Sequence, residues 1–435
     1  MKSLTLTYSL MVMAVLTASV AEAYGADELI DTLTSSIVSA SYGSLVVPQR
    51  ISDKDLESSA NLSEAIRRFS GVQVRDYGGA GGLKTINVRS LGSEHTGVFL
   101  DGIQVDNAQN MQVDLGRFGT ENLQCVSIFN GQKASLLQSA KEYSSASTVY
   151  LETARPEFRS SRNNHRIWLR GGSFGTFSPG MTFERLLKDG ISLRLTGEAV
   201  TSNGQYKFHV SDFRQTPEGT MAGYDTVMIR KNCDIQSLRL EGQLFSSKTS
   251  TSDWNLHAYF FGSERGLPGP VFKRANEYPL SEDRQEDMNV FIQGRWRRTL
   301  SEKWSVMTRF KYSFDELEYL DVPELRPDLN PADFLYKNHT GYLSTAALAV
   351  LSDWWKMNMS VDIQYGYLDS NLRGFCYPSR FSTFGSLTNA FVVGRFEAYA
   401  TLLYINVLDS FLSSSKSRSK AKRNVLMPSV VAKWR

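Results

Sequence analysis

The stretch GVFLDGIQVDNAQ, Gly97 to Gln109, combines the pattern of a hairpin with a polar tip. An apolar run precedes the turn dipeptide Asp101-Gly102, and a second, alternating run ends at Asp106, Asn107 and Gln109. Carboxylate and amide groups at a hairpin tip can bind and release a polar ligand. Neither a nucleophile with its base nor a set of metal ligands stands beside them, so we expect binding rather than catalysis.

Another candidate tip, the first in chain order, lies between expected short strands at Val72–Val74 and Thr85–Val88, and the tip at Asp106–Gln109 is therefore the second. Its glycines would let backbone N–H groups approach a ligand closely, because glycine has no side chain in the way. The candidate ligand-binding residues of this tip are Tyr77, Gly78, Gly79, Gly81 and Gly82. Ordinary surface turns are the alternative interpretation of both tips.

Other reactive residues form no recognisable site in the sequence. Gly171 to Gly175 fits G-x-S-x-G, but it lies between two alternating strands rather than on a strand-turn-helix corner, which argues against a hydrolase. The five histidines are scattered. Cys125, Cys233 and Cys376 give neither a disulfide framework nor metal-ligand spacing. We therefore expect no enzyme, no metal site and no cofactor.

Charge and the first residues indicate the compartment. The net charge is +3 over 435 residues, and basic and acidic residues alternate, which gives no nucleic-acid signature. The basic run Lys416–Arg423 is interpreted as a solvated turn between strands. Lys2, the apolar run Leu10–Leu16 and the small-x-small site Ala21-Glu22-Ala23 predict a cleaved signal peptide over residues 1–23. This apolar run is too short for a membrane anchor.

Two regions of the mature chain follow different patterns. Residues 46–156 mix short strands with short helices, and both Ser52–Asp55 and Asn61–Glu64 have the form of a helix-opening box. The second helix is expected over LSEAIRRF, with Gly71 ending it. In residues 157–435, long runs such as Trp304–Phe314 place an apolar residue at almost every second position. This period predicts sheets with one apolar and one polar face.

A soluble sandwich also alternates, but three features favour an antiparallel transmembrane β-barrel. The strands reach about ten residues, enough to cross a bilayer at a tilt. Short turns such as Lys188–Gly190 alternate with long connections such as Asn203–Arg230. Aromatic residues are expected at strand ends, as an interfacial girdle, and these are Trp168, Trp254, Tyr319, Trp354 and Trp355.

The order of these segments resembles the TonB-dependent outer-membrane receptors, especially their cobalamin and siderophore branch. The resemblance is strongest in LSEAIRRFSGVQVRDYGGAGGLKTINVRSLGSEHTGVFLDGIQVD, and RGGSFGT, SERGLPGP and LMPSVVAKWR also look like receptor segments. Asn130-Gly131-Gln132 stands where the family has R-G-P. Within Ser145–Thr153, Ser147 and Thr148 stand where the family has a glycine pair, so the last strand of the N-terminal domain diverges.

The resemblance implies a mainly β fold, with an N-terminal α+β plug domain at residues 46–156 followed by a transmembrane barrel at residues 157–435. Both hairpin tips would form the floor of a site for a scarce nutrient chelate, cobalamin or a ferric siderophore. Residues 24–45 would carry a TonB box that adds a strand to a TonB-type periplasmic energy-coupling protein. The candidate residues of this box are Asp31, Thr32, Leu33, Ile37, Val38, Ser39 and Ala40. Outer-membrane lipids are the other expected partner, and nucleic acid is not one.

The expected strands are fewer than such a barrel needs. We expect about twelve strands after His165, whereas barrels that hold a plug have about 22. Bare sheet edges in lipid are costly, so we expect an incomplete receptor. The alternatives are a non-transporting surface or adhesion protein, with a surface lipoprotein as partner, a non-functional receptor fragment, and a secreted β-rich enzyme.

Overall fold

The structure is a computed structural model of the 435-residue chain. It describes residues 48–52, 55–56, 58–59, 61–77, 82–105, 112–130, 133, 136–215, 221–247, 251–268, 282–322, 332–412 and 418–434. The expected signal peptide and the TonB-box-like residues Asp31 to Ala40 lie outside these ranges.

The first region is built on a small sheet. Within the described ranges this sheet has five strands in the order β1-β6-β7-β4-β5, with β4 and β7 parallel and the other neighbours antiparallel. Its strands are β1 (Gln49–Ser52), β4 (Thr96–Leu100), β5 (Ile103–Val105), β6 (Leu123–Phe129) and β7 (Ser147–Thr153). A separate hairpin pairs β2 (Val72–Asp76) with β3 (Lys84–Val88), where the sequence predicted two strands.

The short helix α3 (Leu62–Ile66) begins at the predicted position. Asn61 is its N-cap, and the side-chain oxygen of Asn61 accepts a hydrogen bond from the backbone N–H of Glu64 at 3.0 Å. The helix is shorter than predicted, because Arg67 is already its C-cap and the chain then turns towards Gly71, whose φ is +74°. Among the described residues, no helix has both the length and the apolar character needed to cross a membrane.

The N-cap offers a first test of this local structure. Replacing Asn61 with alanine leaves the N–H of Glu64 without its acceptor, so we expect a loss of about 1 kcal/mol in the free energy of unfolding. Denaturant titration of the purified protein measures this loss. Asn61→Asp is the matched control, because aspartate caps a helix equally well; an equal loss in both variants would contradict the capping role.

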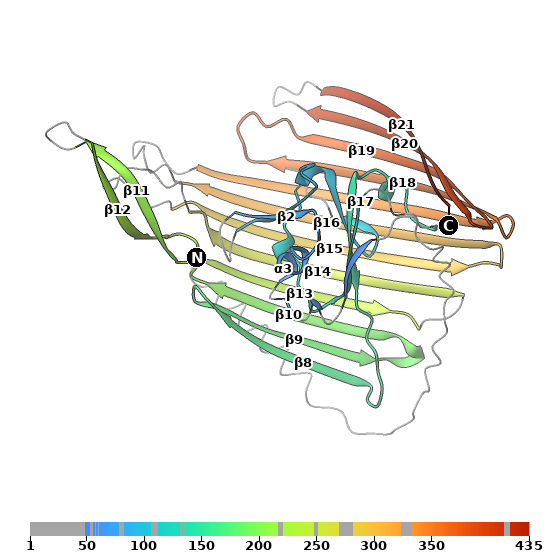
Figure 1. The fold of residues 1–435 in the computed structure, drawn as a ribbon, viewed down its shortest axis with the longest axis horizontal. Helices are drawn as coiled ribbons and strands as arrows, with labels where there is room; N and C mark the ends of the chain where they lie inside the picture. Colours follow the sequence, from blue (N-terminus) through green and yellow to red (C-terminus); the bar gives the residue numbers. More distant parts are fainter. Residues whose placement is uncertain are drawn as a thin grey trace. The chain divides into compact units, whose positions relative to one another are not determined.

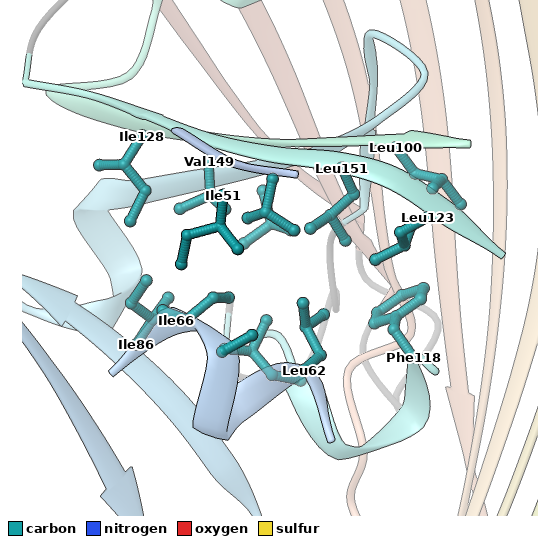
Figure 2. Close-up of a cluster of buried hydrophobic side chains, with 14 of the residues drawn as sticks. Ile51, Leu62, Ile66, Ile86, Leu100, Phe118, Leu123, Ile128, Val149 and Leu151 are labelled. Carbon is teal, nitrogen blue, oxygen red and sulfur yellow. The ribbon is translucent and has the colours of Figure 1, made fainter. Parts of the chain in front are cut away.

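An apolar core joins α3, the β2–β3 hairpin and the small sheet. Figure 2 shows Leu62 and Ile66 of α3 opposite Ile51, Val149 and Leu151 of the small sheet, and all five side chains are buried. Because α3 places its apolar residues on one side, a five-residue helix is enough to close this core.

The divergent last strand, β7, docks in the middle of the small sheet, between β6 and β4. Ser147 and Thr148, which replace the expected glycine pair, are both buried. The hydroxyl of Ser147 lies 3.1 Å from the hydroxyl of Thr96 on the neighbouring strand β4. This hydrogen bond satisfies the buried hydroxyl of Ser147, whereas the buried Oγ1 of Thr148 has no hydrogen-bond partner within the described residues.

The second region forms a large antiparallel sheet. Over the described residues it has twelve strands, as the sequence predicted, in the order β21-β20-β19-β18-β17-β16-β15-β14-β13-β10-β9-β8. Figure 1 shows β8 at one edge and β21 at the other. Its strands are β8 (Asn163–Gly172), β9 (Thr176–Leu186), β10 (Ser192–Ser202), β13 (Ile235–Phe245), β14 (Ser252–Gly266), β15 (Arg284–Thr299), β16 (Trp304–Asp321), β17 (Ala332–Val350), β18 (Trp355–Ser370), β19 (Pro378–Val393), β20 (Phe396–Leu412) and β21 (Arg418–Trp434).

Two connections differ from the sequence prediction. The long connection Asn203–Arg230 contains a hairpin of its own, in which β11 (Lys207–Gln215) pairs with β12 (Met221–Ile229). The basic run Lys416–Arg423 is a strand from Arg418 onward, so its interpretation as a turn is wrong for those residues. The residues from Arg418 onward form a strand because their backbone groups pair with β20, beginning with Arg418 opposite Leu412.

The two faces of the large sheet differ as the period predicted. On the inner face, Arg309 and Asp362 form hydrogen bonds with the small-sheet region, through the carboxylate of Glu142 and the backbone N–H of Lys141. On the opposite, outer face, the side chains are apolar and solvent-exposed. Examples on three strands are Phe310, Tyr312, Val290, Ile292, Val361 and Ile363. A single sheet therefore separates a polar surface from an apolar one.

The predicted aromatic girdle is confirmed at three of the five positions. Trp254 stands opposite Trp296 in the ladder between β14 and β15, near the short turns. At the next short turn, Trp354 and Trp355 stack with each other and with Phe391, with ring centroids 6.1 to 6.3 Å apart.

The assignments of Trp168 and Tyr319 to the girdle are wrong. Trp168 lies on the inner face, where its ring contacts the guanidinium of Arg170 at 5.8 Å, and Arg170 in turn pairs with Glu121. Tyr319 lies an even number of residues from Arg309 along β16, so its side chain is on the same, inner face. Its hydroxyl donates a hydrogen bond to Asp283 at 3.1 Å. Position near a strand end was therefore not enough to predict the face.

Candidate functional site

The described residues of the first predicted tip, Tyr77 and Gly82, do not line the cavity found beside the inner face of the large sheet. Tyr77 is 55% exposed, and its backbone N–H donates to the carbonyl of Leu83 at 3.0 Å. The carbonyl of Gly82 accepts a bond from Nζ of Lys84 at 3.4 Å. Gly78, Gly79 and Gly81, together with Asp106, Asn107 and Gln109 of the second tip, lie outside the described residues. Their role in binding stays a prediction.

The flanks of the second tip line a cavity of about 680 Å³. Gln104 and Val105 at the end of β5, and Val113 beyond the tip, form part of its wall. Strands β17 to β20 form the opposite wall. The lining residues lie near the ends of β18, β19 and β20 that are joined by the longer connections at 371–377 and 413–417. The volume falls in the range of about 300–1,000 Å³ that is common for small-molecule sites.

Charged side chains in the cavity wall are engaged with other side chains. Nε and Nη2 of Arg380 donate to the two carboxylate oxygens of Asp409 at 2.7 and 3.2 Å. Nζ of Lys141 donates to the side-chain carbonyl of Gln364 at 2.5 Å. Glu94 and His95 approach each other at 3.8 Å. The wall therefore offers a polar surface in which Arg380 is engaged by a carboxylate and Lys141 by a neutral amide.

The β4–β5 hairpin, which leads to the second tip, is bound to the inner face of the large sheet. Gln293 donates to the carbonyl of Leu100 and Lys311 to the carbonyl of Gln104, each at 3.3 Å. Gly102 has a φ of +79°, and a Cβ there would lie 2.5 Å from Nη2 of Arg309. Glycine is therefore required at the hairpin turn, both by the backbone conformation and by the closeness of the sheet.

The segment from Gln138 to Ser144, which contains the 3₁₀ turn η4 (Lys141–Tyr143), is a second attachment to the sheet. The backbone N–H of Lys141 donates to Asp362 at 2.7 Å, and the carbonyl of Gln138 accepts from Asn358 at 3.3 Å. Tyr143 packs in an apolar cluster with Leu403 of β20. Backbone groups of this segment are thus satisfied by side chains of the sheet.

Glu142 is the charged centre of this attachment. Its carboxylate accepts hydrogen bonds from Arg309 at 2.7 Å, from the backbone N–H of Ser139 at 3.0 Å and from the hydroxyl of Tyr150 at 2.9 Å. Burial alone would raise the pKa of Glu142, but Arg309, Lys133 and these hydrogen bonds together hold the pKa below its ordinary value. Glu142 is therefore a buried carboxylate in its charged form.

Two further charge clusters join the first region to strands β8 to β16. Arg117, the last residue of the 3₁₀ turn η3 (Leu115–Arg117), contacts Asp287 at 3.3 Å. Glu121 pairs with Arg239 at 3.1 Å and with Arg170. Burial would raise the pKa of Glu121, yet these two arginines bring the pKa below its ordinary value. The first region is thus attached to the large sheet at several of its strands, and not only through Glu142.

The cavity has the size to hold a small molecule. Among the described residues, no group of three or more His, Cys, Asp or Glu side chains is placed to hold a metal ion. Sequence reasoning identified the hairpin that flanks the cavity but missed the opposite wall on β18, β19 and β20. One signal was present, because the run LLYINVL at Leu402–Leu408 is apolar at successive positions and breaks the strict alternation.

Comparison with known families matches the first region. Residues 42–141 match the family described as the TonB-dependent Receptor Plug Domain. The match includes α3, both hairpins and β6, and it ends at Lys141, the first residue of η4. It therefore covers the β4–β5 hairpin but not Glu142.

Solved structures match most of the chain. The copper transporter OprC has a TM-score of 0.64 at 14% identity, and the ferric citrate transporter FecA in its unliganded form has 0.66 at 10%. The FrpB iron transporter from Neisseria meningitidis has 0.67 at 8%. These alignments cover 88–90% of this chain but only 59–61% of the solved chains. The chain thus spans about three fifths of their length, and at such identities the likeness shows a shared fold.

Proposed function

We propose that this chain, which has a TonB-dependent receptor plug domain and the fold of a TonB-dependent receptor with a partial barrel, is an outer-membrane receptor that binds a scarce nutrient chelate and imports it. The cargo would be a ferric siderophore or cobalamin. The cavity between the plug hairpin and strands β17 to β20 carries this proposal, because it has the size of a small-molecule site and adjoins the predicted ligand-binding tip. No bond of the cargo is broken in this function.

The faces of the large sheet support an outer-membrane location. Outer-membrane barrels have an apolar band on the outside and aromatic residues at its borders. The exposed apolar outer face and the cluster of Trp354, Trp355 and Phe391 at a short turn fit this pattern. Residues 1–23 would direct export, and residues 46–156 and 157–435 would form the plug and the barrel segment.

Energy coupling would use the N-terminal segment that contains Asp31 to Ala40. A periplasmic TonB-type protein would bind this segment as an added β-strand, in which backbone hydrogen bonds supply the affinity. The pull would be transmitted to the plug, which is held in the sheet by Glu142 and the two further charge clusters. This mechanism requires free backbone N–H groups in the segment more than any particular side chain.

A proline substitution tests the coupling. Proline has no backbone N–H, so Val38→Pro should abolish uptake of the cargo if the segment binds as a strand. Cells that display the receptor are assayed for uptake of iron-loaded siderophores and cyanocobalamin. Val38→Ala is the matched control, because it shortens the side chain and keeps the N–H group.

The outcomes distinguish the proposed receptor from a surface protein that does not transport. Loss of uptake in Val38→Pro alone, with unchanged amounts of protein at the cell surface, supports energy-coupled import. Uptake that persists in Val38→Pro contradicts coupling through this segment. Display of the wild-type protein without uptake of any supplied chelate favours a role in adhesion or in binding a surface lipoprotein.

A further inference from the structure

Strand β20 departs from the pattern of the large sheet. Its outer-face residues include Leu402 and Leu408, as expected, but the inner-face positions between them are Leu403, Ile405 and Val407. On the neighbouring strand β19, the serines Ser386 and Ser382 stand opposite Leu403 and Val407, whereas β21 places Met427 and Val425 opposite Leu403 and Ile405. Apolar residues on both faces are typical of strands that are covered on both sides. The inner side of β20 therefore requires an apolar partner.

The plug covers only part of this inner surface. Leu403 is buried against Ala140 and Tyr143 of the plug. Ile405 and Val407 lie one step further along β20 and line the cavity together with Phe384 and Phe411. Phe384 stands directly opposite Ile405 in the ladder between β19 and β20. The cavity thus has an apolar floor formed by residues of β19 and β20.

The plug side of the cavity is polar and includes the charged residues Glu94 and Lys141. Plug residues Thr96, Ser144 and Ser145 supply hydroxyl groups. The guanidinium of Arg380 is engaged by both carboxylate oxygens of Asp409, which is buried. An anionic cargo would lose its hydration here and would have to compete with Asp409 for Arg380. An uncharged cargo with one apolar side meets no such cost.

We propose that this cavity selects an uncharged, amphiphilic metal chelate, whose apolar side packs on Ile405 and Val407 and whose polar side contacts the hydroxyl groups of the plug. This inference rests on the proposed function and specifies its class of cargo. Ile405 and Val407 would then determine specificity, while the Arg380–Asp409 pair would disfavour anions.

Two ferric chelates of different charge test the proposal. Equilibrium dialysis of the purified full chain in detergent compares an uncharged ferric trihydroxamate with a trianionic ferric tris-catecholate. We expect the uncharged chelate to bind about tenfold more tightly or better, because Arg380 and Lys141 in the described wall are already engaged by Asp409 and Gln364. Raising the salt concentration should leave the affinity for the uncharged chelate unchanged.

Two substitutions locate the site. Val407→Thr keeps the shape of the side chain and adds a hydroxyl, so it should weaken binding of the trihydroxamate about tenfold. Val425→Thr is the matched control, because Val425 stands opposite Ile405 on β21 but does not line the cavity. Asp409→Asn, which leaves Arg380 without its counter-charge, should improve binding of the trianion about tenfold.

The outcomes separate this inference from the proposed function. Equal or tighter binding of the trianion by the wild-type protein, or equal effects of Val407→Thr and Val425→Thr, would overturn the assignment of cargo class. Failure to bind either chelate would overturn it as well. In each case the uptake assay with Val38→Pro still decides independently whether the chain is an energy-coupled receptor.

Discussion

Replacing Glu142 with alanine should lower the free energy of unfolding by about 3–5 kcal/mol, because the guanidinium of Arg309 would be left buried without its counter-charge. The Glu142 side chain is 2% exposed and the Arg309 side chain 9%. The substitution also removes the acceptor for Ser139 and Tyr150. Denaturant titration monitored by tryptophan fluorescence measures the shift in the unfolding midpoint.

The double variant Glu142→Ala/Arg309→Met is the control for this prediction. It removes both charges, so it should recover part of the lost stability, as apolar replacements of buried ion pairs often do. Arg67→Ala is the exposed comparison, since the Arg67–Asp76 pair is 3.9 Å long and Arg67 is 54% exposed. A cost for Glu142→Ala no larger than that of Arg67→Ala would show that the buried pair does not hold the plug.

The pH dependence follows from the lowered pKa of Glu142. Its ordinary value is 4.5, and the folded protein holds the pKa below this value, because burial is outweighed by Arg309, Lys133 and the hydrogen bonds. The stabilising contribution is therefore complete above pH 4.5 and disappears as the pH falls through the lower folded-state pKa. The difference in stability between the wild type and Glu142→Ala should shrink correspondingly in acid titrations. A difference that grows towards low pH would contradict this account.

Replacing Phe99 with alanine should cost about 3–5 kcal/mol, the usual range for removal of a fully buried aromatic ring. Phe99 is 0% exposed, and its ring stacks on Tyr150 with centroids 5.2 Å apart. Tyr150 in turn contacts Phe129 edge-on at 5.5 Å. Because Phe99 lies on β4, its loss should also loosen the hairpin that flanks the cavity and weaken cargo binding. Thermal unfolding and equilibrium dialysis measure the two effects.

Phe99→Leu provides the conservative comparison and should cost less than about 1.5 kcal/mol, because leucine fills most of the space. Tyr77→Ala on the other hairpin serves as the exposed control, with an expected change within about 0.5 kcal/mol. If Phe99→Ala behaved like Tyr77→Ala, the ring stack would not stabilise the plug. If Phe99→Ala lowered the thermal stability but left cargo binding unchanged, the β4–β5 hairpin would not be needed to shape the cavity.

The class of fold was predictable because its signals are local. Alternation along Trp304–Phe314 predicted the polar and apolar faces of β16, since successive side chains of a strand point to opposite sides. The Asn61 cap and the β2–β3 hairpin were predictable for the same reason, as each depends on residues close together in the chain. The order of such segments also pointed to the family of the plug.

The partners of the buried charges could not be predicted in this way. Glu142 and Arg309 are 167 residues apart, and their contact depends on where the plug docks and on the register of each strand in between. Trp168 differs from these charges, because its inner-face position follows from the alternation with its exposed neighbours Ile167 and Leu169.

Period and turn residues therefore determined that this chain makes a region of short strands and helices followed by long two-faced strands, because backbone geometry repeats over a few residues. Tertiary structure alone brought the β5 flank, the plug hydroxyls and the apolar inner residues of β20 around one cavity. A cavity is formed by side chains from distant segments, and its shape depends on how their backbones dock.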